Sequence, residues 1–462
     1  MHVDSDFISI AIPQVQLFNQ PLIGDAHFNV DSRTIQQGEV FVALVGSQVD
    51  GHDFIEQALQ RGAVGFILAL SKKEYVLKKF QKELASKSVF FVPDPLSALI
   101  QLARAWRSRF TFPVIGITGT VGKTTTKEII RNILKLSKFN ALVSSGNQNT
   151  MIGASMNILK MRSDHDVAVF ELGISKPGAM KQLVELICPT YSVITRVGHG
   201  HMQGLGDMQG VAREKREIFS LFSDRDIGII NGDQPELANI SYKHPVISFG
   251  KKTTNQIQAR KIICAANSIS FIAKIYNKRY QVVLPTCNQA RVMNALAAMA
   301  VGYLLQIPDE ILVRGVEMPV SVEGRFQVIE HASGATLIND AYNANPESTK
   351  AALIAFDQYS TEKHKIVVFG DMLELGPDSA FWHRQIGRFL RKVADLTLVV
   401  LVGREVEWTK KTLPYGLKCL YFPTADAAFE TVRDLASDSK NAILFKSSKS
   451  IGFIELVKKL QA

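Results

Sequence analysis

A glycine-rich turn between a strand pattern and a helix pattern constrains this chain more than any other feature. The run ITGTVGKTTTKEII covers residues 117–130 and continues the apolar strand pattern PVIGITG. Gly119 and Gly122 permit a tight turn whose backbone N–H groups converge on phosphate oxygens. Lys123 can then reach the terminal phosphates, and Thr124 can place its hydroxyl on Mg²⁺. The run therefore predicts a nucleotide-binding phosphate loop in an α/β sheet.

The glycine spacing departs from the usual form of such a loop. The pattern GxxxxGK[ST] requires glycine at position 117, where this chain has Ile117, and Gly116 lies one place earlier. The alternative interpretation is an ordinary glycine-rich turn with an exposed lysine. The position of GKTT between a strand pattern and a helix pattern favours the phosphate loop.

The length of 462 residues predicts about three domains, because a domain typically holds roughly 100–200 residues. Apolar residues make up 46% and charged residues 21%, which excludes disorder as the main state. The longest apolar run, Leu396–Val402, has seven residues and predicts a buried strand, since a membrane-spanning helix needs about 20. The N-terminal run MHVDSDFISIAIPQ lacks the features of a secretory signal. We therefore expect a cytoplasmic protein without an integral membrane segment.

The cysteines fit a reducing compartment. The chain has four, scattered without a CxxC pair: Cys188, Cys264, Cys287 and Cys419. This pattern favours buried thiols over a disulfide framework or a zinc site.

The formal net charge is +10, and a basic excess is typical of proteins that bind polyanions. Lysines and arginines are dispersed along the chain. The densest stretch, residues 72–87, mixes them with glutamate and apolar residues and predicts a solvated helix face. A small phosphate-bearing substrate therefore explains the charge better than a nucleic acid.

Short apolar runs alternate with helix patterns along most of the chain, which predicts βαβ units and parallel sheets. The alternation is regular from Thr336 onward and predicts a Rossmann-like domain. A middle section starts near Pro113, and residues 254–284 alternate like antiparallel strands. Residues 308–324 are interpreted as a hinge. The predicted domains are a small α/β domain at 1–95, a central phosphate-loop domain with a mostly parallel sheet at 96–317, and a C-terminal domain at 318–462.

Several ordered motifs resemble those of the Mur ligases, ATP-dependent enzymes that build the peptide stem of peptidoglycan. In the middle section these are TGTVGKTT, VFELG, GHGHMQGLG and VAREKREIF. The later runs INDAYNANPESTKAAL and FGDMLELGPDS are similar to the branch of the family that adds D-alanyl-D-alanine to UDP-N-acetylmuramoyl-tripeptide. The run VDSRTIQQGEVFVALVGSQVDGHDF is similar to the family's UDP-binding domain, so the resemblance covers nearly the whole chain.

The resemblance implies a magnesium centre, with two ions. Glu171 stands at the carboxyl end of the strand pattern VAVFE, where ligands gather in open α/β sheets, and is expected to bind Mg²⁺ with Thr124. His201 matches the family's metal-contacting histidine, whereas His199 does not. Lys215 matches a lysine that the family carbamylates, which would turn a cation into an anionic metal ligand. The catalytic residues implied are Lys123, Glu171, His201 and Lys215.

The resemblance also carries over binding residues, each of which could alternatively be an ordinary turn or cap residue. The ATP site is expected to use Gly119, Thr120, Gly122, Lys123, Thr124, Thr125, Asn294, Arg325, Asp340 and Asn343. The substrates are expected to contact Ser32, Arg33, Gly46, Asn147, Asn149, Thr150 and Lys449.

Some positions depart from the family pattern. Val121 stands where the family usually has asparagine, Gln203 where it has glutamate, and Ala290 and Arg291 where it has a His-Asn pair. In FKSSKS, Ser447 takes a glycine position and Lys449 an arginine position. Because lysine lacks the planar fork of arginine, binding of the incoming dipeptide is the step that these departures put in question.

The implied activity is formation of an amide bond through an acyl phosphate, in a monomeric enzyme that does not bind nucleic acid. The alternatives are a sister ligase that adds the third stem residue, or glutamate to folate, a phosphate-loop NTPase acting on nucleic acid, and a nucleotide-gated scaffold. The absence of a DNPR-type run and the presence of DAYNAN argue against the sister activities.

Overall fold

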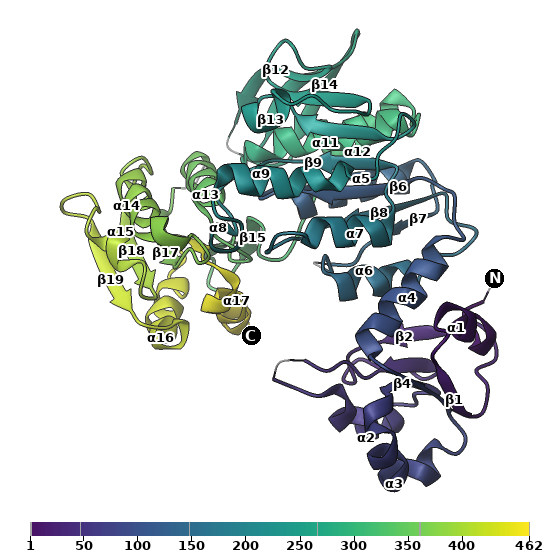
Figure 1. The fold of residues 1–462 in the computed structure, drawn as a ribbon. Coiled ribbons are helices and arrows are strands. Elements are labelled where there is room, and N and C mark those ends of the chain that lie inside the picture. Colours follow the sequence, from purple (N-terminus) through teal and green to yellow (C-terminus); the bar gives the residue numbers. More distant parts are fainter. Residues whose placement is uncertain (1, 47, 147, 266, 360–361, 462) are drawn as a thin grey trace. The chain divides into compact units, whose positions relative to one another are not determined.

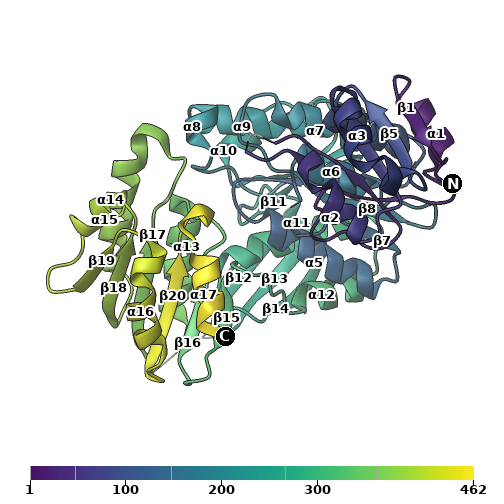
Figure 2. The same ribbon diagram turned by 90° about the horizontal axis from the view of Figure 1, so that it is seen from below.

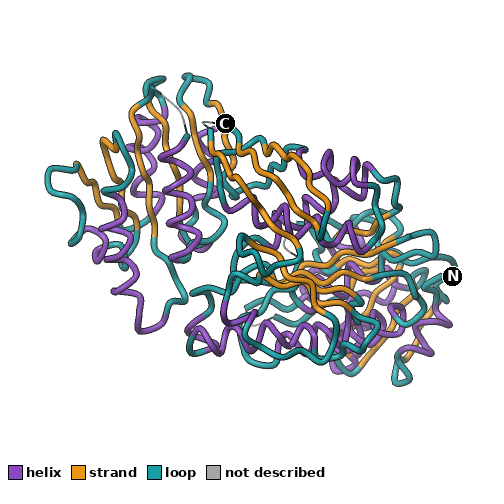
Figure 3. Tube along the Cα trace, turned by 90° about the horizontal axis from the view of Figure 1, so that it is seen from above, coloured by secondary structure: helices purple, strands orange, loops and turns teal. Residues whose placement is uncertain are grey.

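The computed structural model describes residues 2–46, 48–146, 148–265, 267–359 and 362–461. These residues form three β-sheets with helices between the strands, as the ribbon and tube views show (Figures 1 and 3). The chain divides into two compact units, one of residues 1–116, 139–172 and 181–190, the other of 117–138, 173–180 and 191–462. Within the described residues, no helix is long and apolar enough to cross a bilayer. The predicted α/β fold class is confirmed.

The first sheet has the strand order β1-β5-β4-β3-β2. β2 to β5 are parallel, and β1 runs antiparallel beside β5. One core of this sheet packs Phe41, Phe66 and Phe91 against Val76 and Leu84 of a covering helix. The elements are α1 Ser5–Ala11, β1 Gln16–Asn19, β2 His27–Asn29, β3 Glu39–Val42, α2 Ile55–Gln60, β4 Gly65–Ala69, α3 Lys73–Leu84 and β5 Ser88–Val92.

The second sheet has the order β14-β13-β12-β11-β10-β9-β6-β8-β7, and the two units share β6. β9 to β12 are parallel, whereas β12 to β14 form the antiparallel meander that the sequence predicts. The strands are β6 Val114–Thr118, β7 Ala141–Val143, β8 Val167–Glu171, β9 Tyr191–Ile194, β10 Ile227–Asn231, β11 Val246–Gly250, β12 Ile257–Cys264, β13 Ile269–Ile275 and β14 Lys278–Leu284.

Three helices of this section, α4, α6 and α9, begin at side-chain caps. Asp94 accepts a hydrogen bond from Ser97 N before Pro95, the first residue of α4, and Thr150 caps α6 through Gly153 N. The helices of this section are α4 Pro95–Arg107, α5 Lys123–Leu136, α6 Met151–Ile158, α7 Ala179–Ile187, α8 Met202–Leu205, α9 Met208–Arg216, α10 Pro235–Ala238, α11 Ala290–Leu304 and α12 Asp309–Glu317.

The predicted hinge at residues 308–324 is wrong over most of its length. Residues Asp309–Glu317 form α12, which buries Leu312 and Val316. Gly315 lies so close to α5 that an added Cβ would come within 2.7 Å of Ile133 Cα. The connection without helix or strand is therefore limited to residues 318–326, just before β15.

The third sheet has the order β15-β16-β20-β17-β18-β19, with only β15 antiparallel to its neighbour. Asn345 and Ser348 form a capping box around Pro346 at the start of α13. The elements are β15 Gln327–Glu330, β16 Thr336–Asn339, α13 Pro346–Gln358, β17 His364–Gly370, α14 Ser379–Leu390, β18 Leu396–Val402, α15 Glu407–Lys410, β19 Lys418–Phe422, α16 Ala425–Ala436, β20 Asn441–Lys446 and α17 Phe453–Gln461.

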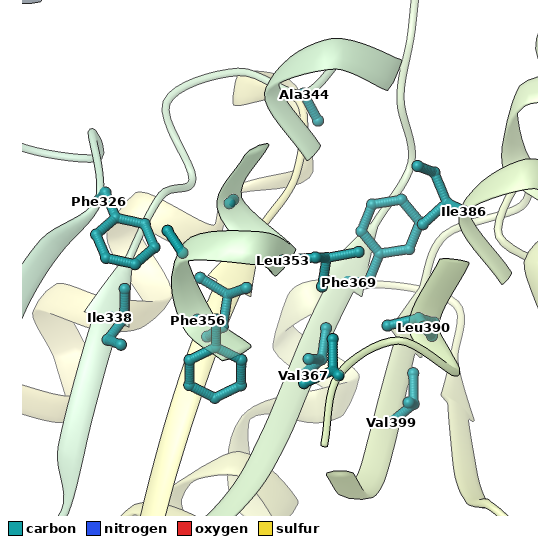
Figure 4. Packing of buried hydrophobic residues seen from close by; sticks show 14 of the residues in the cluster. Phe326, Ile338, Ala344, Leu353, Phe356, Val367, Phe369, Ile386, Leu390 and Val399 are labelled. Carbon is teal, nitrogen blue, oxygen red and sulfur yellow. The ribbon is translucent and has the colours of Figure 1, made fainter. Parts of the chain in front are cut away.

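Alternate residues of each strand in the third sheet enter different cores. Val367 and Phe369 of β17 join the cluster under α13 and α14, which Figure 4 shows from close by. Ile366 and Val368 join the cluster under α16 and α17 on the other face. This is the pattern of a parallel sheet covered on both sides, which Figure 2 shows. The strand predicted at Leu396–Val402 is confirmed as β18.

The structure contradicts the prediction that all four cysteines are buried. All four are free thiols, but only Cys287 is buried, while Cys188 is exposed and the other two are intermediate. The expectation of four buried thiols is therefore wrong, because Cys188 follows the end of α7 on the surface.

The domain boundaries at 95/96 and 317/318 stay a prediction.

Truncation of Phe356 tests the third core. Phe356 is fully buried in the cluster of Figure 4, whereas Phe381 is 52% exposed. Phe356→Ala is expected to lower the free energy of unfolding of this region by about 3–5 kcal/mol through lost burial and a residual cavity. Phe381→Ala, the matched control, is expected to cost less than about 1 kcal/mol. Urea denaturation followed by Trp382 and Trp408 fluorescence measures both, and equal costs would contradict the packing.

Candidate active site

The phosphate loop connects β6 to α5 and requires both of its glycines. Gly122 is the N-cap residue of α5, with a left-handed φ of 91°, and Gly119 has φ of 150°. An added Cβ would lie 2.0 Å from Thr195 Oγ1 at Gly119 and 2.5 Å from Asn294 Oδ1 at Gly122. Neither position has room for a side chain. The predicted turn at the helix N-terminus is therefore present.

Hydrogen bonds fasten the loop to the segment that follows β9. Thr195 Oγ1 donates to Val121 O at 2.7 Å, and Thr120 N donates to Arg196 O at 2.6 Å. Gly198 N donates to Thr120 Oγ1 at 2.9 Å. These contacts fix the turn to the segment after β9, and the contact at Val121 uses its backbone carbonyl.

The side chains of the loop turn into the protein. Lys123 Nζ donates to Gly119 O at 2.8 Å, so the amine lies across the turn from which it is expected to reach phosphates. Thr124 and Thr125 are 8% and 9% exposed in the first turn of α5. The amide groups of this first turn and the N-terminal end of the helix dipole favour an anion at this point.

A cavity of about 120 Å³ opens beside the loop. Five of the residues predicted for the ATP site line it: Gly122, Thr125, Asn294, Arg325 and Asp340. Asn294 comes from α11, while Arg325 and Asp340 flank the first hairpin of the third sheet. The structure thus brings together residues that are far apart in the sequence.

Asp340 forms a buried ion pair that the sequence did not predict. Its Oδ2 lies 2.8 Å from Nζ of Lys446, which is 2% exposed at the end of β20. Burial lowers the pKa of Lys446, and the Asp340 carboxylate opposes that shift. Lys446 also donates to Asn343 O at 2.6 Å. A lysine that ends the apolar run AILFK is the signal that could have identified it.

Asn343 is not among the cavity residues. Its carbonyl accepts from Lys446, and its side-chain oxygen accepts from Ala344 N at 2.9 Å, so it shapes the loop after β16. Tyr342 lies near two cations of this region: the Arg325 guanidinium is 4.1 Å, and Lys449 Nζ 5.9 Å, from its ring centroid. Lys449 is exposed beside the C-terminal sheet.

The departures at positions 290 and 291 change the wall of the same cavity. Ala290 and Arg291 both line it at the start of α11. Arg291 Nη1 donates to Val320 O at 2.8 Å, which links α11 to the connection before β15. Burial lowers the pKa of Arg291, and Asp340 raises it again.

The two histidines of HGHMQGLG have different carboxylate partners. His201 Nδ1 lies 2.6 Å from Glu374 Oε2, and both residues have left-handed φ, 60° and 63°. The Glu374 pKa is lowered, chiefly by its hydrogen bond with His201. His199 Nδ1 lies 2.5 Å from Glu347 Oε1, and its ring packs on Trp382. Neither acidic partner was predicted from the sequence, because each lies on a distant segment.

Glu171 ends β8 and is 3% exposed. Its Oε1 accepts from Asn149 Nδ2 at 3.2 Å, and its N donates to Ser144 Oγ. Its Oε2 is buried without a hydrogen-bond partner among the described residues. A buried carboxylate oxygen in that state fits a cation. Asn149 therefore lies beside Glu171, whereas Thr150 serves as the α6 cap.

Lys215 is 2% exposed in the last turn of α9. Burial lowers the pKa of its amine well below the usual value, the positive charge of Lys123 lowers it further, and Glu214 opposes the shift. Glu214 itself accepts from Gly178 N and Met180 N. Lys215 is therefore not a surface lysine, in contrast to its exposed neighbour Arg213.

The predicted residues of the first sheet lie at the carboxyl ends of β2 and β3. Ser32 is buried, and its Oγ donates to Gln57 Oε1 at 2.7 Å. Arg33 is exposed and forms an ion pair with Asp31, whose pKa it lowers. Gly46 N donates to Val49 O at 2.8 Å in the loop after β3. Asn147 lies outside the described residues.

No group of three or more His, Cys, Asp or Glu side chains that could hold a metal ion occurs within the described residues. The predicted magnesium ligands also include a threonine hydroxyl and a modified lysine, which are of other chemical types. The metal centre therefore stays a prediction.

The fold and the site define a phosphate-loop α/β protein with a cavity shared by the second and third sheets. Family models match three parts of the chain: "Mur ligase family, catalytic domain" residues 27–107, "Mur ligase middle domain" residues 117–302, and "Mur ligase, glutamate ligase domain" residues 324–449. The chain belongs to the Mur ligase family.

Named relatives match over almost the full length. The UDP-N-acetylmuramoyl-tripeptide--D-alanyl-D-alanine ligase of Bacillus subtilis is 32% identical, over 93% of this chain and 92% of its own. The structure of MurF from Acinetobacter baumannii aligns with a TM-score of 0.83 and 27% identity, over 99% of this chain and 98% of that one. MurF from Thermotoga maritima in complex with ADP gives 0.77 and 27%, over 94% and 96%. The resemblance predicted from the motifs is confirmed.

Substitution of Gly122 tests the steric requirement of the loop. Gly122→Ala is expected to lower the affinity for ATP at least about tenfold, because the new Cβ would collide with the Asn294 amide. Gly416→Ala is the matched control, since its φ of 82° is also left-handed but nothing lies within 4 Å of the new Cβ. Titration calorimetry measures both affinities. Equal ATP affinity in the two variants would contradict the assignment of the loop.

Proposed function

We propose that this chain joins D-alanyl-D-alanine to UDP-N-acetylmuramoyl-tripeptide in an ATP-dependent reaction with an acyl-phosphate intermediate. The observation that carries the proposal is the cavity that joins the phosphate loop to Asn294, Arg325 and Asp340. Full-length similarity to proteins named for this ligase activity supports the choice of substrates.

The nucleotide part of the proposal uses the geometry of the loop. The amides of the turn and the first turn of α5 bind the phosphates of ATP, and Lys123 moves from Gly119 O to the terminal phosphates. Arg325 and Lys446 add positive charge at the other wall of the cavity, where Asp340 is already paired. The ribose and adenine then lie toward Asp340 and Asn294.

Magnesium ions would be held by Thr124, Glu171, His201 and Lys215, in two sites. The unsatisfied Glu171 Oε2 fits this assignment, as does the contact of His201 Nδ1 with Glu374, which leaves Nε2 as the ligating nitrogen. When bound, the ions neutralise negative charge on the phosphates and on the acceptor carboxylate.

Lys215 is proposed to act as its carbamate. Burial and the nearby charge of Lys123 lower its pKa and so favour the neutral amine, which is the form that attacks CO₂. An N–C bond forms, one C=O π bond opens, and a proton is released to solvent. The product is an anion with two oxygens, which suits a divalent cation and removes the repulsion between Lys215 and Lys123.

The chemical sequence follows from the weakness of a carboxylate as an electrophile. A carboxylate oxygen of the tripeptide attacks the γ-phosphorus of ATP, and ADP leaves. The amine of D-alanyl-D-alanine then attacks the acyl carbon, the C–O bond to phosphate breaks, and the amine loses a proton. Lys123 and the loop amides stabilise the charge on the transferred group, while a closed cavity limits hydrolysis of the acyl phosphate. We propose a cytoplasmic, monomeric enzyme that does not act on nucleic acid.

Phosphate release by the purified protein tests the proposed activity. The assay contains ATP, Mg²⁺ and UDP-N-acetylmuramoyl-tripeptide, with and without D-alanyl-D-alanine, and the product is identified by its mass. Turnover that requires both co-substrates and yields the pentapeptide is the expected result. Turnover with a single amino acid and a shorter acceptor would instead assign a sister ligase activity, and stimulation by DNA or RNA would assign a different class of NTPase.

Replacement of Lys123 separates the two substrate sites. Lys123→Ala is expected to abolish turnover, because the terminal phosphates lose their cation, while binding of the UDP-sugar substrate stays within about twofold of the wild type. Kinetics and titration calorimetry measure the two effects. Near-normal turnover would refute the placement of the ATP site.

Bicarbonate dependence tests the role of Lys215. Removal of CO₂ is expected to reduce activity and added bicarbonate to restore it, whereas Lys215→Ala is inactive with or without bicarbonate. Arg213→Ala, an exposed neighbour on α9, is expected to keep both activity and bicarbonate dependence. A ¹³C-bicarbonate NMR experiment should show a carbamate signal that Lys215→Ala lacks. An unmodified, fully active wild type would contradict the proposal.

A further inference from the structure

The proposed chemistry gives no role to a buried histidine that lies beside the first sheet. His52 is 1% exposed, and it belongs to a 3₁₀ turn, Gly51–Phe54, that follows the loop after β3. Both of its ring nitrogens have partners. Ala69 N, at the end of β4, donates to Nε2 at 2.9 Å, and Asp50 Oδ1 lies 2.6 Å from Nδ1.

These partners fix the tautomer of His52. A backbone N–H can only donate, so Nε2 accepts and carries no proton. Nδ1 therefore holds the ring proton and donates it to the Asp50 carboxylate. The neutral ring acts as a bridge between the carboxyl end of β4 and Asp50.

The Asp50 carboxylate contacts three groups: the backbone N–H of His52, the ring of His52 and the amine of Lys72. Its Oδ1 accepts from His52 N at 3.0 Å as the cap of the 3₁₀ turn, and its Oδ2 lies 3.0 Å from Lys72 Nζ. The pKa of Asp50 is lowered to about 2: burial opposes the shift, and the hydrogen bonds from His52 and Lys72 outweigh it. The carboxylate is thus charged throughout the physiological pH range.

Asp50 is also the closing residue of the loop that carries Gly46. Val45 and Asp50 form an isolated antiparallel bridge, and Gly51 N donates to Leu44 O at 2.8 Å. The chain is so close at this point that a Cβ on Gly51 would lie 2.7 Å from Leu44 N and O. Within this closed loop, Val45 and Val49 are 60% and 54% exposed.

The loop lies where a parallel sheet binds ligands. It follows the carboxyl end of β3, next to β2, whose carboxyl end precedes Ser32. A loop with exposed apolar side chains fits a planar base, provided that its conformation is set before binding. The buried His52 contacts supply that constraint.

We propose that His52 and Asp50 are positioning residues for the UDP-sugar substrate: through Ala69 N they hold the described parts of the loop after β3, residues 44–46 and 48–51, in their binding conformation. This inference rests on the proposed function, because it takes the first sheet as the UDP-sugar site. Neither side chain is assigned a contact with the substrate. Their effect is expected on substrate binding, not on the chemical step.

Steady-state kinetics of the full-length enzyme test this assignment. His52→Ala is expected to raise the KM for UDP-N-acetylmuramoyl-tripeptide roughly tenfold, while kcat per folded enzyme and the KM for ATP change by less than about twofold. His52→Gln is expected to recover most of the loss, because its amide oxygen can accept from Ala69 N and its NH₂ can donate to Asp50. His27→Ala, which changes an exposed histidine of β2, is the matched control.

The milder variant Asp50→Asn keeps an acceptor for His52 but loses the charge facing Lys72, and we expect about a threefold increase in the same KM. A purely structural role would lower the thermal stability and the active fraction without changing this KM. That result, in a folded His52→Ala or Asp50→Asn enzyme, would overturn the inference while the proposed function stands. A wild type that neither binds nor consumes the UDP-sugar would overturn both.

Discussion

The close approach of the phosphate loop to its neighbours is the constraint on which the site depends. Gly119 lies against Thr195 and Gly122 against Asn294, at separations that exclude any side chain. One turn of backbone is thereby fixed to the segment after β9 and to α11. Asn294 lines the cavity at that point, and Arg325 and Asp340 complete the wall from the third sheet. The second and third sheets thus both contribute residues to one cavity beside the loop.

Buried charge decides what that site can bind. The acids Asp340 and Glu347 line the cavity together with more numerous basic residues, which are Arg196, Arg291, Arg325 and Lys446. Lys215 lies close enough to Lys123 for the charge of Lys123 to lower its pKa. Burial lowers the pKa values of Lys215 and Lys446, because the folded protein disfavours the charged form of each amine. Such a centre favours anionic ligands such as phosphates.

Local sequence patterns predicted the parts of the molecule that are set by local physics. The glycine turn before α5 and the alternation in β12 to β14 depend on neighbouring residues, and the structure confirms them. The hinge prediction failed because packing against α5 stabilises α12. The pairs Lys446–Asp340 and Glu374–His201 could not be predicted, since Lys446 lies 106 residues from its partner and only the fold brings them together. The roles of the substrate residues stay predictions for the same reason.

The central claim is that ATP activates a carboxylate of the UDP-sugar substrate, and the fate of a carboxylate oxygen tests it most directly. The measurement uses tripeptide substrate with ¹⁸O in the reacting carboxylate and analyses the released phosphate by mass. An acyl-phosphate intermediate predicts that each phosphate released with product carries one labelled oxygen. Unlabelled phosphate, with product still formed, would contradict the account.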